Sequence, residues 1–430
     1  MLPGAIAQCR LCHAVGNGRT RYSKCWAPGS ARDWSIEPLY YGSMFGGTSG
    51  WKANVYMKSD LTVLIPNMRC GGAERVTSLM VNGLSRRGYR ITLMTLAGPE
   101  DPFYALDGAV SVVPLGREGE AAQSAGTPGS VLGRVGKIQG VLDRVRPDAV
   151  VGIMTECNVL AVLATRIMGR HPCRVLLSEH IHPATTCRRT VAVSARLATF
   201  PFADAIVPCS REMAGWYERW LPRPPVVPIQ NPAVLGERPY DPEARSMAAE
   251  IGRGKWVLSM GRLAEQKGFD RLIDALALVE PDLRRHWTVG IVGDGPLKGR
   301  LQRRIEARNL DGEVVFLGRY CDPYPVLRAG EAFVMSSRYE GFPIALTEAM
   351  ACGLPAVSFD CPTGPSEIIR HDVDGLLVPD GDVEGLAEAL ERLMSDDRLR
   401  RQMAERALEV RERFGLEGFL DRWEELIRQF

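Results

Sequence analysis

The sequence predicts an α/β protein made of two doubly wound, Rossmann-like domains. Short apolar runs that suit parallel strands alternate with longer stretches that suit amphipathic helices. The alternation occurs twice, on either side of a proline-rich stretch at residues 222–242, where we place the interdomain linker. The chain has 430 residues, 45% of them hydrophobic, which is enough for each half to bury its own core.

The apolar runs of each half place the individual elements. In the first half, strands are expected at residues 61–66, 91–96, 110–114, 149–153, 174–178, 205–207 and 226–229, and helices at 71–87, 131–145 and 159–168. In the second half, strands are expected at 256–260, 287–292, 314–317, 332–335, 356–359 and 375–378, and helices at 268–278, 296–308 and 343–352. Residues 383–430 are predicted to form two or three amphipathic helices.

Residues 1–57 differ from the rest of the chain. They are rich in Gly, Ser and Arg and show little periodicity, so we interpret them as a disordered extension or as upstream sequence translated from a misplaced start. Met57 is the alternative start. The 11 cysteines show no disulfide-like pattern, which favours a reducing cytoplasm. No apolar run approaches the roughly 18–20 residues that cross a bilayer, and the first ten residues do not suit a signal peptide.

Charge is distributed unevenly around a net value of +2. Residues 60–235 carry 19 Lys and Arg against 14 Asp and Glu, whereas residues 236–430 carry 27 against 35. A basic first half suits an acidic acceptor or an anionic membrane surface, and ordinary solvated surface stays open as the alternative. No dense basic run is present, which argues against nucleic-acid binding.

Two carboxylates mark the most informative stretch of the chain. Glu340 follows the predicted strand 332–335, and Glu348 lies in the first turns of the predicted helix 343–352. The carboxyl end of a strand that faces a helix N-terminus is where such domains bind ligands, and the free N–H groups there favour a phosphate. Carboxylates accept hydrogen bonds from hydroxyls. A phosphate site between two such carboxylates predicts binding of a nucleotide sugar.

Two cations follow the first strand of the second half. Arg262 and Lys267 stand near the start of the predicted helix 268–278. An arginine fork and a lysine point charge suit a diphosphate, and they would stabilise the charge that builds on a leaving nucleoside diphosphate. Asp372, Asp374, Asp380 and Asp382 flank a late strand, and we interpret them as turn residues, not metal ligands.

Further polar and glycine-containing turns follow other strands. Gly71 and Gly72 open the first predicted helix, where glycine permits close backbone approach. His180 follows the strand 174–178 and can donate to a sugar hydroxyl, with His182 as the competing choice and Glu179 as a residue that could orient either ring. Residues 360–368 form another turn after a strand, which either lines the same site or only connects elements.

These motifs together resemble the retaining GT-B glycosyltransferases of family four. The resemblance extends from about Asp60 to the C-terminus and is carried by Glu340–Gly341–Phe342–Pro343, Glu348–Ala349–Met350, Gly261–Arg262 with Lys267–Gly268, Gly293–Asp294–Gly295–Pro296, Gly318–Arg319 and Gly71–Gly72–Ala73–Glu74–Arg75. It implies a GT-B fold in which an acceptor domain (58–235) faces a nucleotide-sugar domain (236–410) across a cleft. The last helix, 411–430, would cross back to the first domain.

The resemblance also implies roles for single residues. Catalytic residues would be Glu340, His180, Arg262 and Lys267. Substrate-binding residues would be Gly71, Gly72, Arg262, Lys267, Gly293, Asp294, Gly318, Arg319, Glu340, Gly341, Phe342, Pro343, Ile344 and Glu348. Glu348 would hold the ribose hydroxyls, and backbone N–H groups near Ile344 would face the sugar or diphosphate. The family is generally metal-independent, so no cofactor is expected.

We therefore expect a retaining hexosyltransferase that moves a sugar from a nucleotide-diphosphate donor to a hydroxyl of a glycan or polyprenyl-diphosphate-linked acceptor. Bacterial surface polysaccharide or lipopolysaccharide assembly is the expected setting, in the cytoplasm, with peripheral contact at the inner membrane face left open. The alternatives are a nucleotide-sugar 2-epimerase on the same fold and a non-catalytic donor-binding homologue. A nicotinamide dehydrogenase is disfavoured because no Gly-x-Gly-x-x-Gly turn follows residues 61–66.

Overall fold

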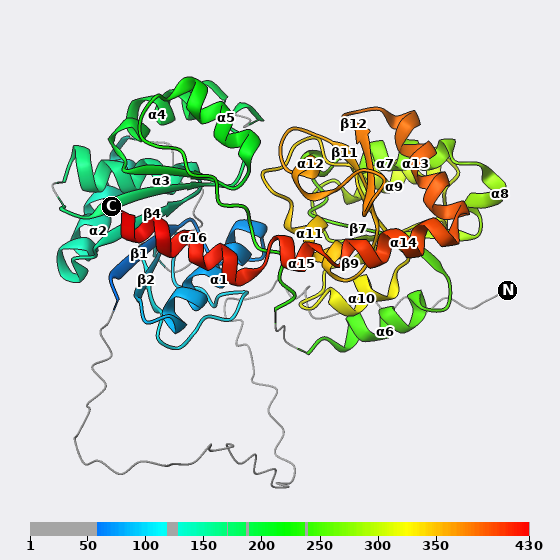
Figure 1. Ribbon diagram of the computed structural model, residues 1–430, viewed down its shortest axis with the longest axis horizontal. Coiled ribbons are helices and arrows are strands. Elements are labelled where there is room, and N and C mark those ends of the chain that lie inside the picture. Colours follow the sequence, from blue (N-terminus) through cyan, green and yellow to red (C-terminus); the bar gives the residue numbers. More distant parts are fainter. Residues whose placement is uncertain (1–57, 118–127, 170, 186–188, 237–239, 430) are drawn as a thin grey trace, which may run out of the picture. The chain divides into compact units, whose positions relative to one another are not determined.

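Two six-stranded sheets, parallel throughout, organise the protein (Figure 1). The computed structural model describes residues 58–117, 128–169, 171–185, 189–236 and 240–429, all within one compact unit. The extension at 1–57, with its expected disorder and the alternative start at Met57, lies outside these residues. Both sheets have the same strand order, 3-2-1-4-5-6 in their own numbering, which is the doubly wound arrangement that the sequence predicts.

The first sheet runs in the order β3-β2-β1-β4-β5-β6. Its strands are β1 (Asp60–Ile65), β2 (Arg90–Thr95), β3 (Ser111–Pro114), β4 (Ala149–Ile153), β5 (Arg174–Glu179) and β6 (Ala205–Pro208). Successive side chains of a strand point to opposite faces. Val63 and Ile65 therefore pack in one core with α1 (Gly72–Arg86) and α16 (Leu416–Gln429), while Leu64 packs with α2 (Pro128–Val145) and α3 (Met154–Val162).

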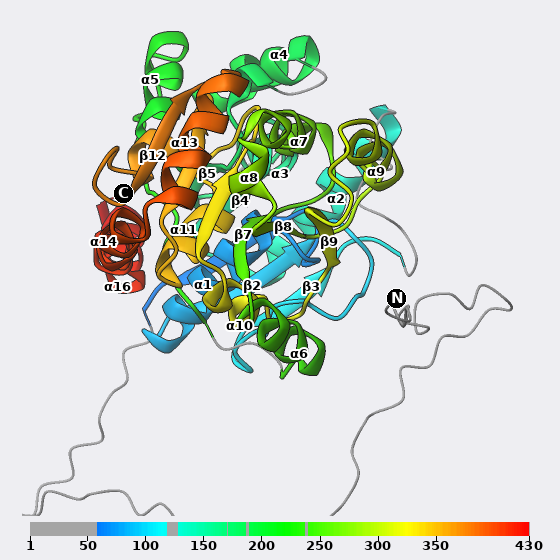
Figure 2. The same cartoon turned by 90° about the vertical axis from the view of Figure 1, so that its right-hand side faces the viewer.

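The second sheet runs in the order β12-β11-β10-β7-β8-β9. Its strands are β7 (Lys255–Met260), β8 (Trp287–Val292), β9 (Val314–Gly318), β10 (Ala332–Met335), β11 (Ala356–Asp360) and β12 (Gly375–Pro379). Val257 packs in a core with α7 (Phe269–Leu278), α9 (Lys298–Ala307) and α13 (Val383–Ser395). Leu258 packs with α6 (Pro242–Ile251), α10 (Tyr324–Ala329) and α11 (Ile344–Ala351), and α6 and α10 lie side by side in Figures 1 and 2.

The predicted elements are found within a few residues of their expected bounds, with three corrections. Residues 226–229 lie beside β6 but form only one isolated bridge, between Ile206 and Val226. Val227 and Ile229 donate to β6, but Pro208 of β6 has no N–H to donate in return, so the strand ladder does not continue. The helix expected at 159–168 begins earlier, at Met154, and continues as a π-helical turn, Leu163–Ile167. The tail contains four helices, α13, α14 (Asp397–Ala407), α15 (Val410–Arg413) and α16, where two or three were expected.

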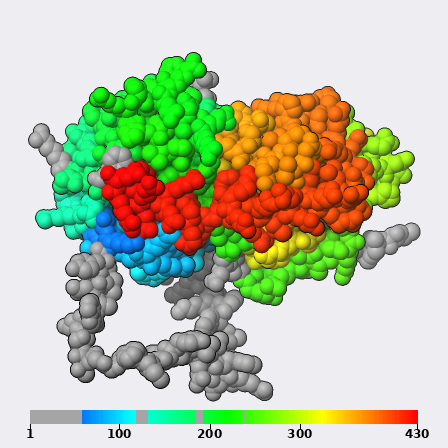
Figure 3. Space-filling model, in the orientation of Figure 1, coloured from blue at the N-terminus to red at the C-terminus, as the bar shows by residue number. Residues whose placement is uncertain are grey.

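The C-terminal helix α16 packs on the first domain. Phe419 and Trp423 share a core with Met80 of α1, and Leu420 lies where a side chain at Gly83 would stand. Figure 1 shows α16 beside α1, and Figure 3 shows the red C-terminal segment on the surface beside both halves. A single segment therefore ties both domains together at this face.

Candidate active site

The predicted site residues follow the carboxyl ends of strands. Lys267 lies in the 3-10 turn Glu265–Lys267 after β7, and Glu340 lies between β10 and α11. The Lys267 Nζ donates to Glu340 Oε1 at 2.6 Å, and the Ser337 hydroxyl donates to the same oxygen at 2.6 Å. Glu340 is 5% exposed. The structure thus brings the predicted lysine and the first predicted glutamate into direct contact.

Arg262 follows the same strand, β7, but its side chain does not join the Lys267–Glu340 pair. Its side chain is exposed, and among the described residues it has no hydrogen bond or ion pair. Burial raises the pKa of Glu74, in the first turn of α1, while a backbone hydrogen bond and the charge of Arg262 act in the opposite direction. The charge of Arg262 thus acts on Glu74 of the first domain, and the guanidinium N–H groups can bind an anion.

The second glutamate has partners of its own. Glu348, in α11, is 5% exposed, and the Tyr324 hydroxyl donates to its Oε1 at 2.8 Å. Arg75 Nε, from α1 of the first domain, lies 3.8 Å from the same oxygen. Each of the two glutamates thus has its own cation nearby: Lys267 for Glu340 and Arg75 for Glu348.

Sequence reasoning included Arg75 in the motif at residues 71–75 but gave it no role of its own, and it assigned no role to Tyr324. For Arg75 a signal existed, because a cation in the first turn of a helix opposes the helix dipole and so calls for another explanation. Tyr324 begins α10 and has no such signal, because only the folding of α10 against α11 brings its hydroxyl to Glu348.

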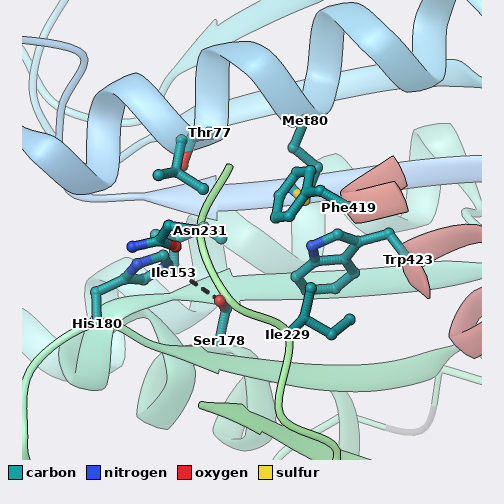
Figure 4. A pocket seen from close by; sticks show the side chains of 10 residues that line it. Thr77, Met80, Ile153, Ser178, His180, Ile229, Asn231, Phe419 and Trp423 are labelled. Carbon is teal, nitrogen blue, oxygen red and sulfur yellow. Dashed lines mark hydrogen bonds between the residues drawn. The ribbon is translucent and has the colours of Figure 1, made fainter. Parts of the chain in front are cut away.

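His180 follows β5 and lines a small cavity. Its Nε2 lies 3.1 Å from the Ser178 hydroxyl, and its Nδ1 is buried with no hydrogen-bond partner among the described residues. His180, Thr77 and Asn231 help to line a cavity of about 10 Å³, which has room for about one water molecule. Figure 4 shows the His180 ring beside Asn231, with its hydrogen bond to Ser178. Burial lowers the pKa of His180 to about 4, so the ring is neutral at pH 7.

The alternatives near His180 differ from what was expected. The His182 ring packs edge-on against Trp216, with ring centres 6.4 Å apart. Glu179 does not orient either histidine; this expectation is wrong. Adjacent strand residues point to opposite faces, so the Glu179 carboxylate lies in a buried network of hydrogen bonds with Arg196, Tyr217, Asn158 and Thr155.

The Gly341 turn brings the backbones of the two domains together. A Cβ at Gly341 would overlap the His180 carbonyl oxygen, so only glycine permits this approach. Asn231 Nδ2 donates to the Phe342 carbonyl at 3.1 Å. Pro343 is the N-cap of α11 and has no N–H, which leaves the first N–H groups of the helix, from Ile344 onward, as the donors there.

The remaining loops border the same edge. A Cβ at Gly293 would overlap the Gly261 carbonyl, and Gly293 N donates to the Gly318 carbonyl at 2.7 Å. Asp294 and Arg319 are exposed. Gly71 precedes α1, and Gly72 lies beside Ile344. The segment 360–368, which includes α12 (Pro365–Ile368), contacts the Glu340 loop, since the Thr363 hydroxyl donates to the Glu340 carbonyl at 2.5 Å.

The aspartates of the two Asp-x-Asp sequences have structural partners. Asp374 is buried and pairs with Arg370 and Arg413, and Asp382 caps α13 by accepting from Gly385 N. Within the described part of the chain, no three His, Cys, Asp or Glu side chains gather as metal ligands would. No helix in that part is both long and apolar enough to span a membrane.

Both halves of the chain match known family models. Residues 70–235 match Glycosyltransferase Family 4, and residues 242–410 match Glycosyl transferases group 1.

Curated relatives include three bacterial proteins. An exopolysaccharide phosphotransferase of Streptomyces coelicolor is 36% identical over 272 residues, which are 62% of this chain and 28% of that protein. An amylovoran biosynthesis glycosyltransferase of Erwinia amylovora is 29% identical over 85% of this chain and 99% of its own length. An N-acetylgalactosaminyltransferase of Campylobacter jejuni, named for an undecaprenol-diphosphate-linked substrate, is 24% identical over 86% of this chain and 98% of its own length.

Solved structures share the fold. Sucrose-phosphate synthase of Thermosynechococcus elongatus matches with a TM-score of 0.72 and 18% identity over 86% of this chain and 99% of that one. The Anabaena protein HepE in complex with UDP matches with a TM-score of 0.66 and 19% identity over 86% and 100%. These likenesses confirm the predicted GT-B fold.

Proposed function

The chain belongs to the glycosyltransferases that join a Glycosyltransferase Family 4 domain to a Glycosyl transferases group 1 domain, and from this premise we propose that it transfers a sugar from a nucleoside-diphosphate donor. The acceptor is a hydroxyl of a glycan or of a polyprenyl-diphosphate-linked glycan, in bacterial polysaccharide or lipopolysaccharide assembly. The relatives from Erwinia and Campylobacter, matched over nearly their whole length, support this acceptor class.

One observation carries the proposal: the Lys267–Glu340 pair lies beside the N-terminus of α11. The helix start supplies N–H donors for a phosphate, and Lys267 supplies a positive charge. Glu340 then accepts hydrogen bonds from sugar hydroxyls while remaining bonded to Lys267. Arg262, exposed on the same edge, adds a second cation for the diphosphate, so we propose that neither a metal nor a cofactor takes part.

We propose that transfer proceeds with retention, on one face of the sugar. The bond between the anomeric carbon and the β-phosphate oxygen breaks, and the leaving diphosphate is stabilised by Arg262 and Lys267. The acceptor oxygen bonds to the anomeric carbon on the same face, and its proton passes to the departing phosphate oxygen. His180, neutral at pH 7, offers a hydrogen bond to a donor-sugar hydroxyl, not a charge.

The test uses the purified protein and three donor classes. UDP-, GDP- and ADP-sugars are first screened for thermal stabilisation, because a ligand that binds the native state raises its melting temperature. The stabilising donor is then incubated with a polyprenyl-diphosphate-linked glycan, and the anomeric configuration of the product is read by NMR. We expect transfer with retention, about 100-fold or more reduced in Lys267→Ala and Glu340→Ala.

Lys298→Ala is the matched control, because Lys298 is an exposed lysine of the same domain at the start of α9. Full transferase activity in Lys267→Ala or Glu340→Ala would refute these roles. Epimer formation from a UDP-sugar without acceptor would instead identify a 2-epimerase, and inversion at the anomeric carbon would contradict the front-face route.

We also propose peripheral contact with the inner face of the cytoplasmic membrane through the first domain. Phe202 and Trp220 are each 55% exposed, and the Arg219 guanidinium lies over the Trp220 ring. The Phe200 and Tyr217 rings stack with centres 6.2 Å apart, which joins the segment of Phe202 to α5 (Arg211–Trp220). Aromatic and basic side chains together suit an anionic lipid surface.

A further inference from the structure

The surroundings of Glu348 include an arginine whose hydrogen bonding is incomplete. Arg75 is 6% exposed, and its Nη2 makes two long contacts of 3.4 Å, to the Val234 carbonyl and the Tyr324 hydroxyl. The guanidinium lies 5.5 Å from the centre of the Tyr104 ring. A Cβ at Gly236 would overlap Nη2, so the guanidinium occupies space that the glycine leaves open. Packing, more than hydrogen bonding, holds this side chain in place.

The Nε of Arg75 faces Glu348 without bonding to it. This nitrogen is buried and has no hydrogen-bond partner among the described residues. Its distance to Glu348 Oε1 is 3.8 Å, which is too long for a hydrogen bond. A buried charged donor without a partner is unfavourable and rare, which indicates that another group completes the site.

A hydroxyl group has the hydrogen-bonding chemistry that would complete this pair. A hydroxyl both donates and accepts, so one hydroxyl can give its hydrogen to a carboxylate and receive a hydrogen bond from a guanidinium. With bonds of about 2.7 Å to the carboxylate and about 2.9 Å to Nε, one oxygen reaches both groups across the separation that the structure shows.

We infer that Arg75 is a specificity-determining residue for the donor: its Nε–H donates to a ribose hydroxyl whose hydrogen Glu348 accepts. This inference rests on the proposed function, in which a nucleoside diphosphate occupies the second domain. It adds that the first domain also contacts the nucleoside, through the first turn of α1. Recognition of the ribose hydroxyls then depends on both domains being in place.

A purely structural role for Arg75 predicts something different. If the guanidinium only balances the charge of Glu348, its loss lowers the affinity for every nucleotide equally. If the guanidinium bonds to one ribose hydroxyl, its loss lowers the affinity only for those nucleotides that carry this hydroxyl. The ratio of two dissociation constants measured on one variant separates the cases, because a partly unfolded fraction affects both constants alike.

The experiment measures dissociation constants by isothermal titration calorimetry for the full chain. The ligands are whichever of UDP, GDP and ADP the wild type binds most tightly, and its 2′-deoxy and 3′-deoxy analogues. The variants are Arg75→Met, Arg75→Lys and, as the matched control, Arg86→Met. Arg86 lies in the last turn of the same helix, has a side chain 73% exposed, and pairs only with Asp107 among the described residues.

We expect the wild type to prefer the ribonucleotide over one deoxy analogue by about tenfold or more, as the loss of one charge-assisted hydrogen bond implies. Arg75→Met should raise the dissociation constant of the ribonucleotide about tenfold and leave the dissociation constant of that deoxy analogue unchanged. Arg75→Lys keeps the charge but lacks the Nε–H, so it should also lose the preference for the ribonucleotide. If Arg75→Met does not fold, the test uses Arg75→Lys alone. Arg86→Met should behave as the wild type.

Equal weakening of all three ligands in both Arg75 variants, or no change in any, would overturn the inference and leave the proposed function intact. A wild-type protein that binds none of UDP, GDP and ADP would overturn both.

Discussion

Removing Lys267 should destabilise the second domain even in the absence of any ligand. Glu340 is 5% exposed, and its Oε1 accepts from Lys267 and Ser337, at 2.6 Å each. Lys267→Met leaves a buried carboxylate with only the hydroxyl as a partner for that oxygen. Breaking a buried ion pair by removing one partner costs about 3–5 kcal/mol.

The lower end of that range applies here, because the Lys267 side chain is 19% exposed and water can partly replace it. We therefore expect Lys267→Met to lower the free energy of unfolding by about 3 kcal/mol. For a domain of this size, each kcal/mol shifts the melting temperature by about 2–4 °C, so the expected fall is about 6–12 °C. Glu340→Gln should cost about 1 kcal/mol, because Lys267 can then turn toward solvent.

A double-mutant cycle measured by urea denaturation isolates the pair. Lys267→Met combined with Glu340→Gln should be more stable than the sum of the single effects by about 2 kcal/mol, because no unpaired buried charge remains. Lys298→Met is the control and should change little. A Lys267→Met protein that melts within about 1 °C of the wild type, or single effects that simply add, would refute the view that this pair is a buried, coupled unit.

Three further predictions concern other parts of the molecule. Because burial lowers the pKa of His180 to about 4, the unfolded chain takes up a proton below pH 6.5 that the folded protein refuses until about pH 4. The free energy of unfolding should therefore fall as pH drops from 6.5 to 4, by up to about 3 kcal/mol. His180→Gln should flatten the dependence of the free energy of unfolding on pH, whereas the control His286→Gln, at an exposed histidine, should not. If the plots of unfolding free energy against pH are parallel for His180→Gln and the wild type, the slope does not come from His180. Gly341→Ala should lower the free energy of unfolding, measured by thermal unfolding, by about 1–3 kcal/mol, because the added Cβ meets the His180 carbonyl. The control Gly299→Ala, in α9, should be neutral or stabilising. Equal effects of the two substitutions would contradict the close contact at Gly341. In sedimentation with vesicles, the double variant Phe202→Ser, Trp220→Ser should bind anionic lipid less well, with no change in binding to neutral lipid. The control Leu278→Ser, at an exposed leucine of the second domain, should bind as the wild type does. Unchanged binding of the double variant to anionic vesicles would exclude this surface.

Much of the fold could be predicted because each strand is a local apolar run. The central strands β1, β4, β7 and β10 are buried on both faces, so they appear in the sequence as mostly apolar stretches, interrupted only by small polar residues such as Thr62 and Ser259 or at their first residue. Residues 226–229 have the same apolar character and donate to β6, but Pro208 of β6 has no N–H to donate in return, so a continuous strand ladder does not form.

The candidate site was predictable only in part. Lys267 and Glu340 follow two adjacent strands of one sheet, so their contact follows from the predicted topology. The cation near Glu348 is Arg75, which is far away in the sequence and comes within 3.8 Å of the Glu348 carboxylate only when the two domains pack together. The expectation that Glu179 orients a histidine was wrong for a similar reason. The position of Glu179 in β5 decides which face of the sheet its carboxylate points to, and its partners on that face, Arg196 and Tyr217, come from other parts of the chain.

The central claim is that Arg262, Lys267, Glu340 and Glu348 converge on one nucleotide sugar. The most direct measurement is a crystal structure of the protein with an intact nucleotide sugar or its nucleoside diphosphate. The account predicts the diphosphate between Arg262, Lys267 and the start of α11, with the ribose beside Glu348. A nucleotide bound elsewhere, with these four side chains away from it, would contradict the account.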